Sequence, residues 1–372
     1  MEINDDNRGN MMPVEEKSAQ KKDKPATSQV QGRTTDPTSL AQAHPYASLT
    51  PEHVVAAVES TGRLSDARIL ALNSYENRVY QVGIDDGPPV IAKFYRPARW
   101  SLEQIAEEHA FTAFLAERDI PVVTPLAIAD NSETPTVGRY LDFYFSVYPR
   151  QGGRAPELDN LEHLHQLGQF VGRIHMASQG FPFQHRVQLT VQRFGRDSVD
   201  FLLSHDFIPD DLRSAYQSIA HDLLDQIEQR SPQKSGYQQI SLHGDCHPGN
   251  VLWRDERPHF VDFDDAMTGP AMQDLWMLLS GDTASRERQL GDIIEGYEMF
   301  HSFDTAELQL IEPLRALRVL HYSAWLARRW HDPAFPLSFP WFNTQRYWAE
   351  HILELRELYA AVQERPLQLP SF

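Results

Sequence analysis

The stretch LHGDCHPGNVLW, residues 242–253, concentrates side chains that can move protons or bind metal ions. These side chains belong to His243, Asp245, Cys246, His247 and Asn250. The Pro-Gly pair among them prevents a helix or a strand from running through the stretch. Because a core segment would not carry so many polar groups, we interpret the stretch as an active-site loop. The pattern H-x-D, followed by Asn five residues after the Asp, is typical of a phosphoryl-transfer loop.

Phosphoryl transfer also needs groups that hold the nucleotide phosphates and Mg²⁺, and the sequence supplies candidates in the order found in protein kinases. The segment VIAK places Lys93 on a predicted strand, and Glu107 and Glu108 follow on a predicted helix. Asp262 ends an apolar strand, and a predicted hairpin brings it back beside Asn250, so that both can offer hard oxygen ligands to Mg²⁺. Any one match arises often by chance, but four matches in the kinase order favour kinase chemistry.

Longer stretches strengthen this interpretation. HGDCHPGN, VDFDDA and GPAMQDLW resemble the Brenner-motif kinases, the superfamily of aminoglycoside phosphotransferases, choline kinases and homoserine kinases. Within it, NSYENRVYQV, KFYRPARWSLEQIAEEHAF and RRWHDPAFP resemble a group of bacterial serine/threonine protein kinases of the stress response. The resemblance runs from about residue 46 to the C-terminus. It implies a protein-kinase-like fold, ATP as co-substrate and Mg²⁺ as cofactor.

For the catalytic loop, the resemblance implies that Asp245 is the proton acceptor. It implies that Asn250 and Asp262 bind Mg²⁺, and that Asp262 is also an active-site residue. Asp274, on the helix that follows, would steady the catalytic loop.

For the nucleotide, the resemblance implies that Lys93 holds the phosphates, paired with a helix glutamate. Kinase spacing favours Glu108 over Glu107 for this pairing, and both remain open. Ser74 would contact ATP from the turn LNSYENRVY, which replaces a glycine-rich loop. This turn contains no glycine, so side chains rather than closely approaching backbone amides must donate to the phosphates.

The hydrophobic patterns predict an α+β, bilobal architecture. Residues 46–148 are expected to form a small antiparallel β lobe with one main helix, which binds the nucleotide. Residues 149–372 are expected to form a larger helical lobe for catalysis and substrate binding. Residues 1–45 are polar and are expected to be a disordered tail. The expected strands are RILALNS, NRVYQVGI, VIAKFY, VVTPLAIA and LDFYFSVYP, with helices over TPEHVVAAVES and SLEQIAEEHAFTAFLAER.

Composition narrows the partners. The 372 residues carry a formal net charge of −18, which disfavours nucleic acids and anionic membrane surfaces as partners. The single cysteine, Cys246, excludes an intrachain disulfide. There is neither a long apolar run nor a signal-peptide pattern, so we expect a cytoplasmic monomer.

The predicted function is an ATP- and Mg²⁺-dependent kinase that phosphorylates Ser or Thr residues of a protein substrate. Two alternatives remain. A small-molecule kinase for an amino alcohol, sugar or aminoglycoside would use the same catalytic residues, and a cationic acceptor would require a deep acidic pocket. An ATP-binding pseudokinase scaffold is disfavoured by the intact catalytic set. A set of arginines forms either a substrate-facing basic patch or ion pairs with nearby acids. The set comprises Arg315, Arg318, Arg328 and Arg329.

Overall fold

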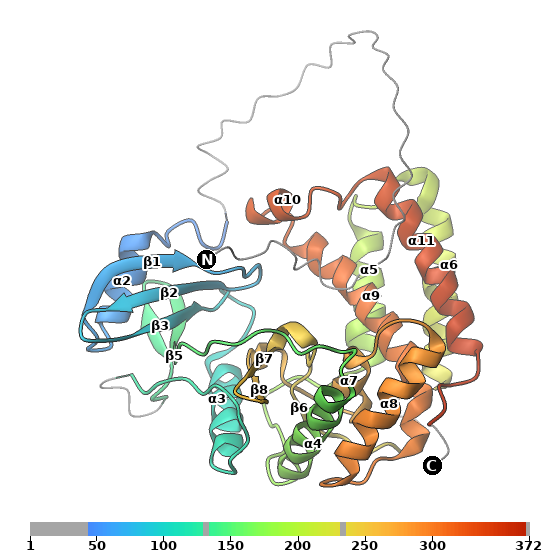
Figure 1. Cartoon of the computed structure of the whole chain (residues 1–372). Coiled ribbons are helices and arrows are strands. Elements are labelled where there is room, and N and C mark those ends of the chain that lie inside the picture. The colour runs from blue at the N-terminus through green and yellow to red at the C-terminus, as the bar shows by residue number, and fades with distance from the viewer. Residues whose placement is uncertain (1–43, 129–133, 231–235, 370–372) are drawn as a thin grey trace, which may run out of the picture. The chain divides into compact units, whose positions relative to one another are not determined.

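The chain from His44 onward has a β-rich first region and a largely helical second region (Figure 1). This computed structural model describes residues 44–128, 134–230 and 236–369. The predicted α+β architecture, with a small antiparallel sheet before a larger helical part, is thereby confirmed. The predicted tail, 1–45, lies outside the described residues except for its last two positions.

Five antiparallel strands form the sheet of the first region, in the order β1-β2-β3-β5-β4. They are β1 (Ser65–Ala71), β2 (Arg78–Ile84), β3 (Gly87–Phe94), β4 (Gly138–Tyr140) and β5 (Phe143–Pro149). Lys93 lies on the central strand β3, opposite Val79 of β2 and Ser146 of β5. Because it is flanked by strands on both sides, Lys93 is held at a fixed position in the sheet.

The strand predicted over VVTPLAIA is wrong. Within this segment, Val123 donates to the Phe260 carbonyl at 3.1 Å and Leu126 donates to the Val147 carbonyl at 2.7 Å, but no continuous ladder forms. Pro121 and Pro125 lack the amide hydrogens that a strand pairing requires. The short strand β4, which was not predicted, pairs with β5 instead.

Two helices complete the first region. Helix α2 (Pro51–Glu59) begins at a proline, and the Thr50 side chain makes no capping hydrogen bond. Helix α3 (Leu102–Ala116) begins with a capping box of Ser101 and Gln104. Phe111 and Leu115 of α3 belong to the hydrophobic core of the second region, so α3 joins the sheet to the helices.

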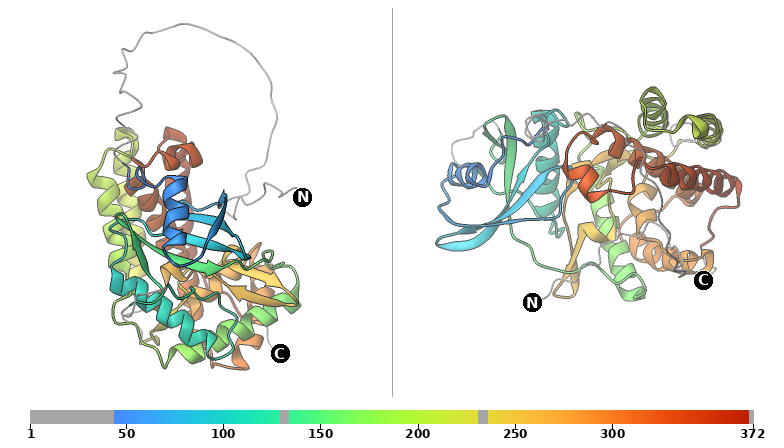
Figure 2. Two further views of the ribbon diagram at one scale, coloured as in Figure 1. Left: turned by 90° about the vertical axis from the view of Figure 1, so that its left-hand side faces the viewer. Right: turned by 90° about the horizontal axis from the view of Figure 1, so that it is seen from above.

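The second region consists mainly of helices, which lie beside the sheet in the views of Figure 2. The α-helices are α4 (Leu161–Ser178), α5 (Asp197–Ser204), α6 (Asp210–Gln229), α7 (Met272–Leu275), α8 (Thr283–Glu298), α9 (Ile311–Arg328), α10 (Ala334–Ser338) and α11 (Gln345–Gln363). A π-helical turn, η1 (Gln192–Arg196), precedes α5. Short 3₁₀ turns are η2 (Pro248–Asn250), η3 (Phe263–Asp265), η4 (Trp276–Leu278) and η5 (Thr305–Leu310). Within the described ranges, no helix combines the length and the apolar character needed to cross a membrane.

Two short antiparallel pairs lie between the sheet and the large helices (Figure 1). Strand β6 (Ile240–Leu242) pairs with β9 (Met267–Gly269), and β7 (Val251–Arg254) pairs with β8 (Arg257–Phe260). The β7–β8 hairpin was predicted, whereas the β6–β9 pair was not. Both pairs frame the candidate active site. The predicted lobe boundary between residues 148 and 149 falls at the end of β5 and stays a prediction.

Candidate active site

The β7–β8 hairpin brings Asn250 and Asp262 to the same end of the site. Val251 pairs with Phe260, and the Val261 amide donates to the Asn250 carbonyl at 3.0 Å. Asp262 follows directly, with a left-handed backbone (φ 58°) that is unusual for a residue other than glycine. This conformation ends the strand, and 53% of the Asp262 side chain stays exposed.

Asp274 fixes the backbone of the predicted catalytic loop, which confirms its expected structural role. Its carboxylate accepts hydrogen bonds from the amides of His243, at 2.9 Å, and Gly244, at 2.8 Å. Gly244 adopts φ +85°, and a Cβ there would collide with the Asp265 carbonyl, so glycine is required. His175, fully buried, lies 3.1 Å from the same Asp274 carboxylate. The loop therefore rests on a desolvated carboxylate with defined partners.

Asp245 is held by neighbours of the opposite charge. Its carboxylate pairs with Arg318 of α9 at 2.5 Å and lies 3.5 Å from the ring of His247. The Asn250 amide donates to the Asp245 carbonyl at 3.0 Å. Burial raises the pKa of Asp245, but Arg318 and His247 outweigh it and hold that pKa well below its usual range. Asp245 is therefore ionised at neutral pH, as a carboxylate that orients a hydroxyl must be.

Lys93 contacts the segment that follows β8 directly. Its ammonium pairs with Asp262 at 2.8 Å and with Asp264 at 3.2 Å. Burial lowers the pKa of Lys93, but Asp262, Asp264 and Glu108 raise it well above the usual lysine value. Lys93 therefore stays charged although it is 6% exposed. The two predicted segments, far apart in sequence, thus face the same space.

The two helix glutamates have different surroundings. Glu107 accepts hydrogen bonds from three consecutive backbone amides, those of residues 184–186, at 2.6–2.8 Å. Glu108 is 2% exposed and interacts electrostatically with Lys93, although it makes no direct ion pair with it. Burial raises the pKa of Glu108 to about 7, against the opposing effect of Lys93. The surroundings of Glu108 thus fit the predicted pairing, and those of Glu107 fit an anchor for a loop.

Arg99 is a site residue that sequence reasoning missed. Its guanidinium pairs with Asp264 at 2.6 Å and with Asp265 at 2.5 Å. Asp264 is buried and also accepts from the Asn77 amide at 3.2 Å, so it links the nucleotide turn, Lys93 and Arg99. The available signal was the basic run RPAR immediately after the Lys93 strand.

The glycine-free turn is ordered by its own side chains. The Ser74 hydroxyl donates to the Asn77 carbonyl at 3.1 Å. The Asn77 side chain accepts from the Arg96 amide at 3.2 Å and donates to Asp264. The side chains of Ser74, which is predicted to contact ATP, and of Asn77 are therefore engaged within this structure.

The donor set fits a hard divalent cation. The Asn250 amide nitrogen is used by Asp245, which leaves Asn250 Oδ1 without a donor among the described residues. Asp262 Oδ1 accepts from Lys93, and Asp262 Oδ2 likewise has no donor in the described chain. Amide and carboxylate oxygens are the ligands that Mg²⁺ takes, usually with water and phosphate oxygens completing the shell. Groups of three or more His, Cys, Asp or Glu side chains that could hold a metal do not occur among the described residues.

The arginines of α9 divide between the two expected arrangements. Arg315 pairs with Glu312 at 3.2 Å, and Arg329 pairs with Glu76 at 2.5 Å. Arg318 pairs with Asp245. Arg328 donates to the Asp197 carbonyl at 3.0 Å and has no carboxylate at ion-pair distance within the described chain.

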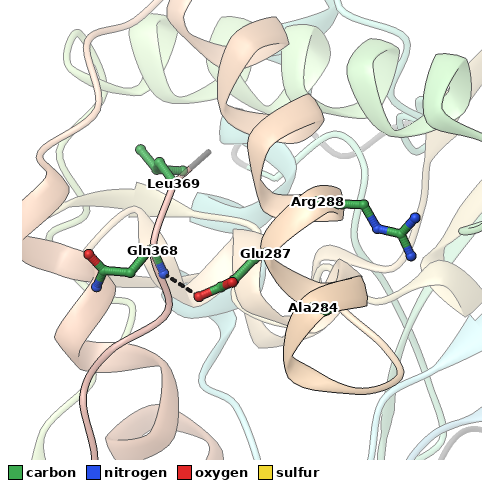
Figure 3. Close-up of a pocket in the computed structure, with 5 residues that line it drawn as sticks. All are labelled: Ala284, Glu287, Arg288, Gln368 and Leu369. Atoms are coloured by element: carbon green, nitrogen blue, oxygen red, sulfur yellow. Dashed lines mark hydrogen bonds between the residues drawn. The ribbon is translucent and has the colours of Figure 1, made fainter. Parts of the chain in front are cut away.

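A separate pocket lies between α8 and the C-terminal segment (Figure 3). The Gln368 amide donates to Glu287 there at 2.9 Å. None of the predicted site residues lines this pocket. It is therefore not part of the candidate active site.

Comparisons with known proteins agree with this geometry. The profile of the phosphotransferase enzyme family matches residues 68–311. Stress response kinase A of Escherichia coli (strain K12) is 42% identical over 324 residues, which cover 87% of this chain and 97% of that protein. Serine/threonine protein kinase RdoA of Salmonella typhimurium (strain LT2) is 41% identical over the same shares. The structure of a microcompartment-associated aminopropanol kinase is 17% identical, with a TM-score of 0.64 over 84% of this chain and 98% of that one, which is a similarity of fold.

Proposed function

Because the chain belongs to the phosphotransferase enzyme family, and within it to the group of stress response kinase A, we propose that it transfers the γ-phosphoryl group of ATP to Ser or Thr hydroxyls of proteins during a bacterial stress response. One observation carries the proposal. Lys93 of the sheet pairs with Asp262, which follows β8, next to the loop that holds Asp245 and Asn250. Motif matches that arose by chance would not be expected to place these residues next to one another in the folded chain.

The chain's own residues provide the steps of an in-line transfer. Ionised Asp245 accepts a hydrogen bond from the acceptor hydroxyl and orients it toward the phosphorus. The Lys93 ammonium, fixed between two carboxylates, stabilises the negative charge of the nucleotide phosphates. Asn250 Oδ1 and Asp262 would hold Mg²⁺, which supplies positive charge to the phosphate oxygens when bound. Arg318 and His247 keep Asp245 in its acceptor form and position.

The similarity to stress response kinase A and to serine/threonine protein kinase RdoA supports a protein acceptor rather than an aminoglycoside or an amino alcohol. The cytoplasmic location and the monomeric state stay predictions.

The test compares wild-type protein and Asp245→Asn with radiolabelled ATP, Mg²⁺ and a generic protein substrate. We expect label on Ser and Thr of the protein, and a loss of about 10²–10⁴-fold in the variant, because a positioned proton acceptor typically contributes that much. A panel of amino alcohols, sugars and aminoglycosides runs in parallel. Label on a metabolite alone would replace protein by a small-molecule acceptor. Equal ATP consumption by wild type and variant would favour the pseudokinase alternative.

A further inference from the structure

The segment RRWHDPAFP, residues 328–336, contains charged residues that the transfer of the phosphoryl group does not use. It runs from the end of α9 into α10. In Figure 1, α10 lies on the side of the helical region that faces the sheet. The contacts of this segment lead to the nucleotide turn of the other region.

Asp332 is almost completely buried, with a side chain 1% exposed. Its carboxylate pairs with Arg78 at 3.0 Å and with Arg96 at 2.8 Å. Arg78 begins β2 directly after the nucleotide turn, and Arg96 follows β3 three residues after Lys93. Burial raises the pKa of Asp332, but the hydrogen bond from Arg96 and the charge of Arg78 outweigh burial and lower that pKa below its usual value. The carboxylate is therefore ionised at neutral pH. An acid from the helical region thus bridges two strands of the sheet.

Glu76 makes the reciprocal connection from within the turn. Its carboxylate pairs with Arg96 at 2.9 Å and, from the helical region, with Arg329 at 2.5 Å. The Trp325 indole donates to the same carboxylate at 2.5 Å. Glu76 side-chain exposure is 12%, so these contacts are shielded from water and from salt.

Aromatic rings close the arrangement on both sides. The rings of Tyr75 and Phe339 lie 4.8 Å apart, across the two regions. The Tyr46 ring contacts the guanidinium groups of Arg78, at 4.4 Å, and Arg96, at 5.3 Å, and its hydroxyl donates to the Glu76 carbonyl at 3.0 Å. The turn is therefore held both by its backbone and by the carboxylate of Glu76.

We call the set Glu76, Arg78, Arg96, Arg329 and Asp332 the clasp. We propose that the clasp holds the glycine-free turn in the conformation that receives ATP, so that Asp332 and Arg329 of the helical region are positioning residues for the nucleotide. This inference rests on the proposed function. It explains how a turn without glycine remains in place over the phosphates: its position is fixed from the opposite region.

Helix α9 extends the same connection to the catalytic loop. Arg318, Trp325 and Arg329 are spaced by seven and four residues, which places them along one face of a helix. Arg318 pairs with Asp245, while the other two bind Glu76. One helix therefore sets the distance between the turn and the proposed proton acceptor.

The experiment measures binding of a fluorescent ATP analogue to the full chain, with Mg²⁺ and no acceptor. The variant is Asp332→Asn, which keeps the shape of the side chain and removes its charge. Loosening that leaves a tenth of the turns competent raises the apparent Kd about tenfold. We expect that rise, a matching rise in KM for ATP, and kcat at saturating ATP within about twofold of wild type. Asp332→Glu, which restores the charge, is expected to recover part of the affinity.

A double-mutant cycle tests the second connection. Glu76→Gln and Arg329→Gln are each expected to weaken nucleotide binding, and the double variant is expected to lose less than the product of the two effects, because both remove one interaction. Arg315→Gln is the matched control, since Arg315 lies on the same helix but pairs with Glu312. Hydrogen exchange of the amides of residues 74–78 is expected to speed up in Asp332→Asn and to stay unchanged in the control.

The outcomes separate the two proposals. A normal Kd for nucleotide in a folded Asp332→Asn variant, or a loss of kcat without a change in Kd, would overturn the clasp and leave the kinase proposal intact. Failure of the wild-type chain to bind nucleotide would overturn both. If Asp332→Asn does not fold, the Glu76–Arg329 cycle decides in its place, and additive effects there would argue against the clasp.

Discussion

The catalytic loop and the nucleotide turn are held in place in different ways. The loop, residues 243–250, rests on one buried carboxylate, Asp274, which binds two successive loop amides and lies beside His175. The turn, residues 73–77, has one internal hydrogen bond from a side chain, and its Glu76 pairs with Arg329, more than two hundred positions away. Arg78, directly after the turn, pairs with Asp332. The loop is thus fixed by hydrogen bonds within the helical region, and the turn by charges from the other region.

This difference has consequences for energy and motion. A buried backbone amide that loses its acceptor is left desolvated without a hydrogen bond, which costs free energy. Other conformations of the loop are therefore much less stable. An ion pair between two regions can be exchanged for water or for phosphate oxygens when the regions move apart. We therefore expect the loop to be invariant through the reaction and the turn to be the part that responds to nucleotide.

The largest expected effect comes from removing the support of the loop. Asp274→Ala leaves the amides of His243 and Gly244 without acceptors in a buried place. We expect the free energy of unfolding to fall by about 3–5 kcal/mol, as for the removal of one partner of a buried charged group. Phosphoryl transfer is expected to fall with it, and thermal unfolding followed by circular dichroism measures the loss.

Asp282→Ala serves as the control for Asp274→Ala. Asp282 caps α8 by accepting from the Ser285 amide at 2.8 Å, in an exposed position. Losing this cap is expected to cost about 1 kcal/mol without affecting transfer. Equal stabilities of the two variants would contradict the view that the loop rests on Asp274.

Lys93 lies between the segment after β8 and the nucleotide turn, because it pairs with Asp262 and Asp264 and Asp264 also binds Asn77. Lys93→Met removes the cation between Asp262 and Asp264 and leaves Glu108 without the positive charge that most favours its ionised form. We expect kcat/KM for ATP to fall about 10²–10³-fold, the usual cost of a lost electrostatic contact to the transition state. Steady-state kinetics measures this change, with Arg346→Met as the control because Arg346 is exposed on α11 and pairs with Glu350. Retained activity in Lys93→Met would contradict the role proposed for Lys93 at the phosphates.

The difference between the catalytic loop and the nucleotide turn also explains which contacts the sequence could predict. His243, Asp245 and Asn250 directly precede the β7–β8 hairpin and Asp262 follows it, so their spacing along the chain nearly determines their spacing in space. Lys93 could be placed because a central strand has a typical pattern of buried residues. Local rules of this kind also predicted helix α3, whose first turn contains a capping box of Ser101 and Gln104.

The clasp could not be predicted because nothing local relates its members. Glu76 and Arg329, or Arg78 and Asp332, become neighbours only when the helical region packs against the sheet. The strand expected over VVTPLAIA was wrong for a local reason. Its apolar pattern is typical of a strand, but Pro121 and Pro125 lack the amide hydrogens that strand pairing needs.

A pH profile sharpens the contrast at Glu108. The pKa of about 7 means that the carboxyl loses its proton near neutrality. We expect kcat/KM for ATP to fall roughly tenfold for each pH unit below about pH 7 as Glu108 becomes neutral beside Lys93. Glu108→Gln is expected to remove this limb and to hold activity at the low level throughout. A limb that persists in the variant would assign the titration to another group.

Stability should change in the opposite direction with pH at the same residue. A carboxyl whose pKa is raised by folding binds its proton more tightly in the folded chain, so the free energy of unfolding falls as pH rises from about 4.5 to 7. Glu108→Gln is expected to flatten this part of the stability curve, as urea unfolding at several pH values can measure. Activity that rises while stability falls would indicate that the ionised form is kept for function.

The smallest effect is expected at Ser74, the residue predicted to contact ATP. Its hydroxyl already donates to the Asn77 carbonyl, so in this conformation its proton is not directed at phosphate. Ser74→Ala should therefore lose one hydrogen bond within the turn, about 0.5–1.5 kcal/mol, and raise KM for ATP by less than about tenfold. Isothermal titration with ATP would measure the change, and Ser74→Thr, which keeps the hydroxyl, should bind like wild type. A larger loss of ATP affinity in Ser74→Ala than in Lys93→Met would contradict this expectation. It would show that the turn binds phosphate through Ser74 itself. The turn's own side chains would then matter more than the charges that hold the turn from the helical region.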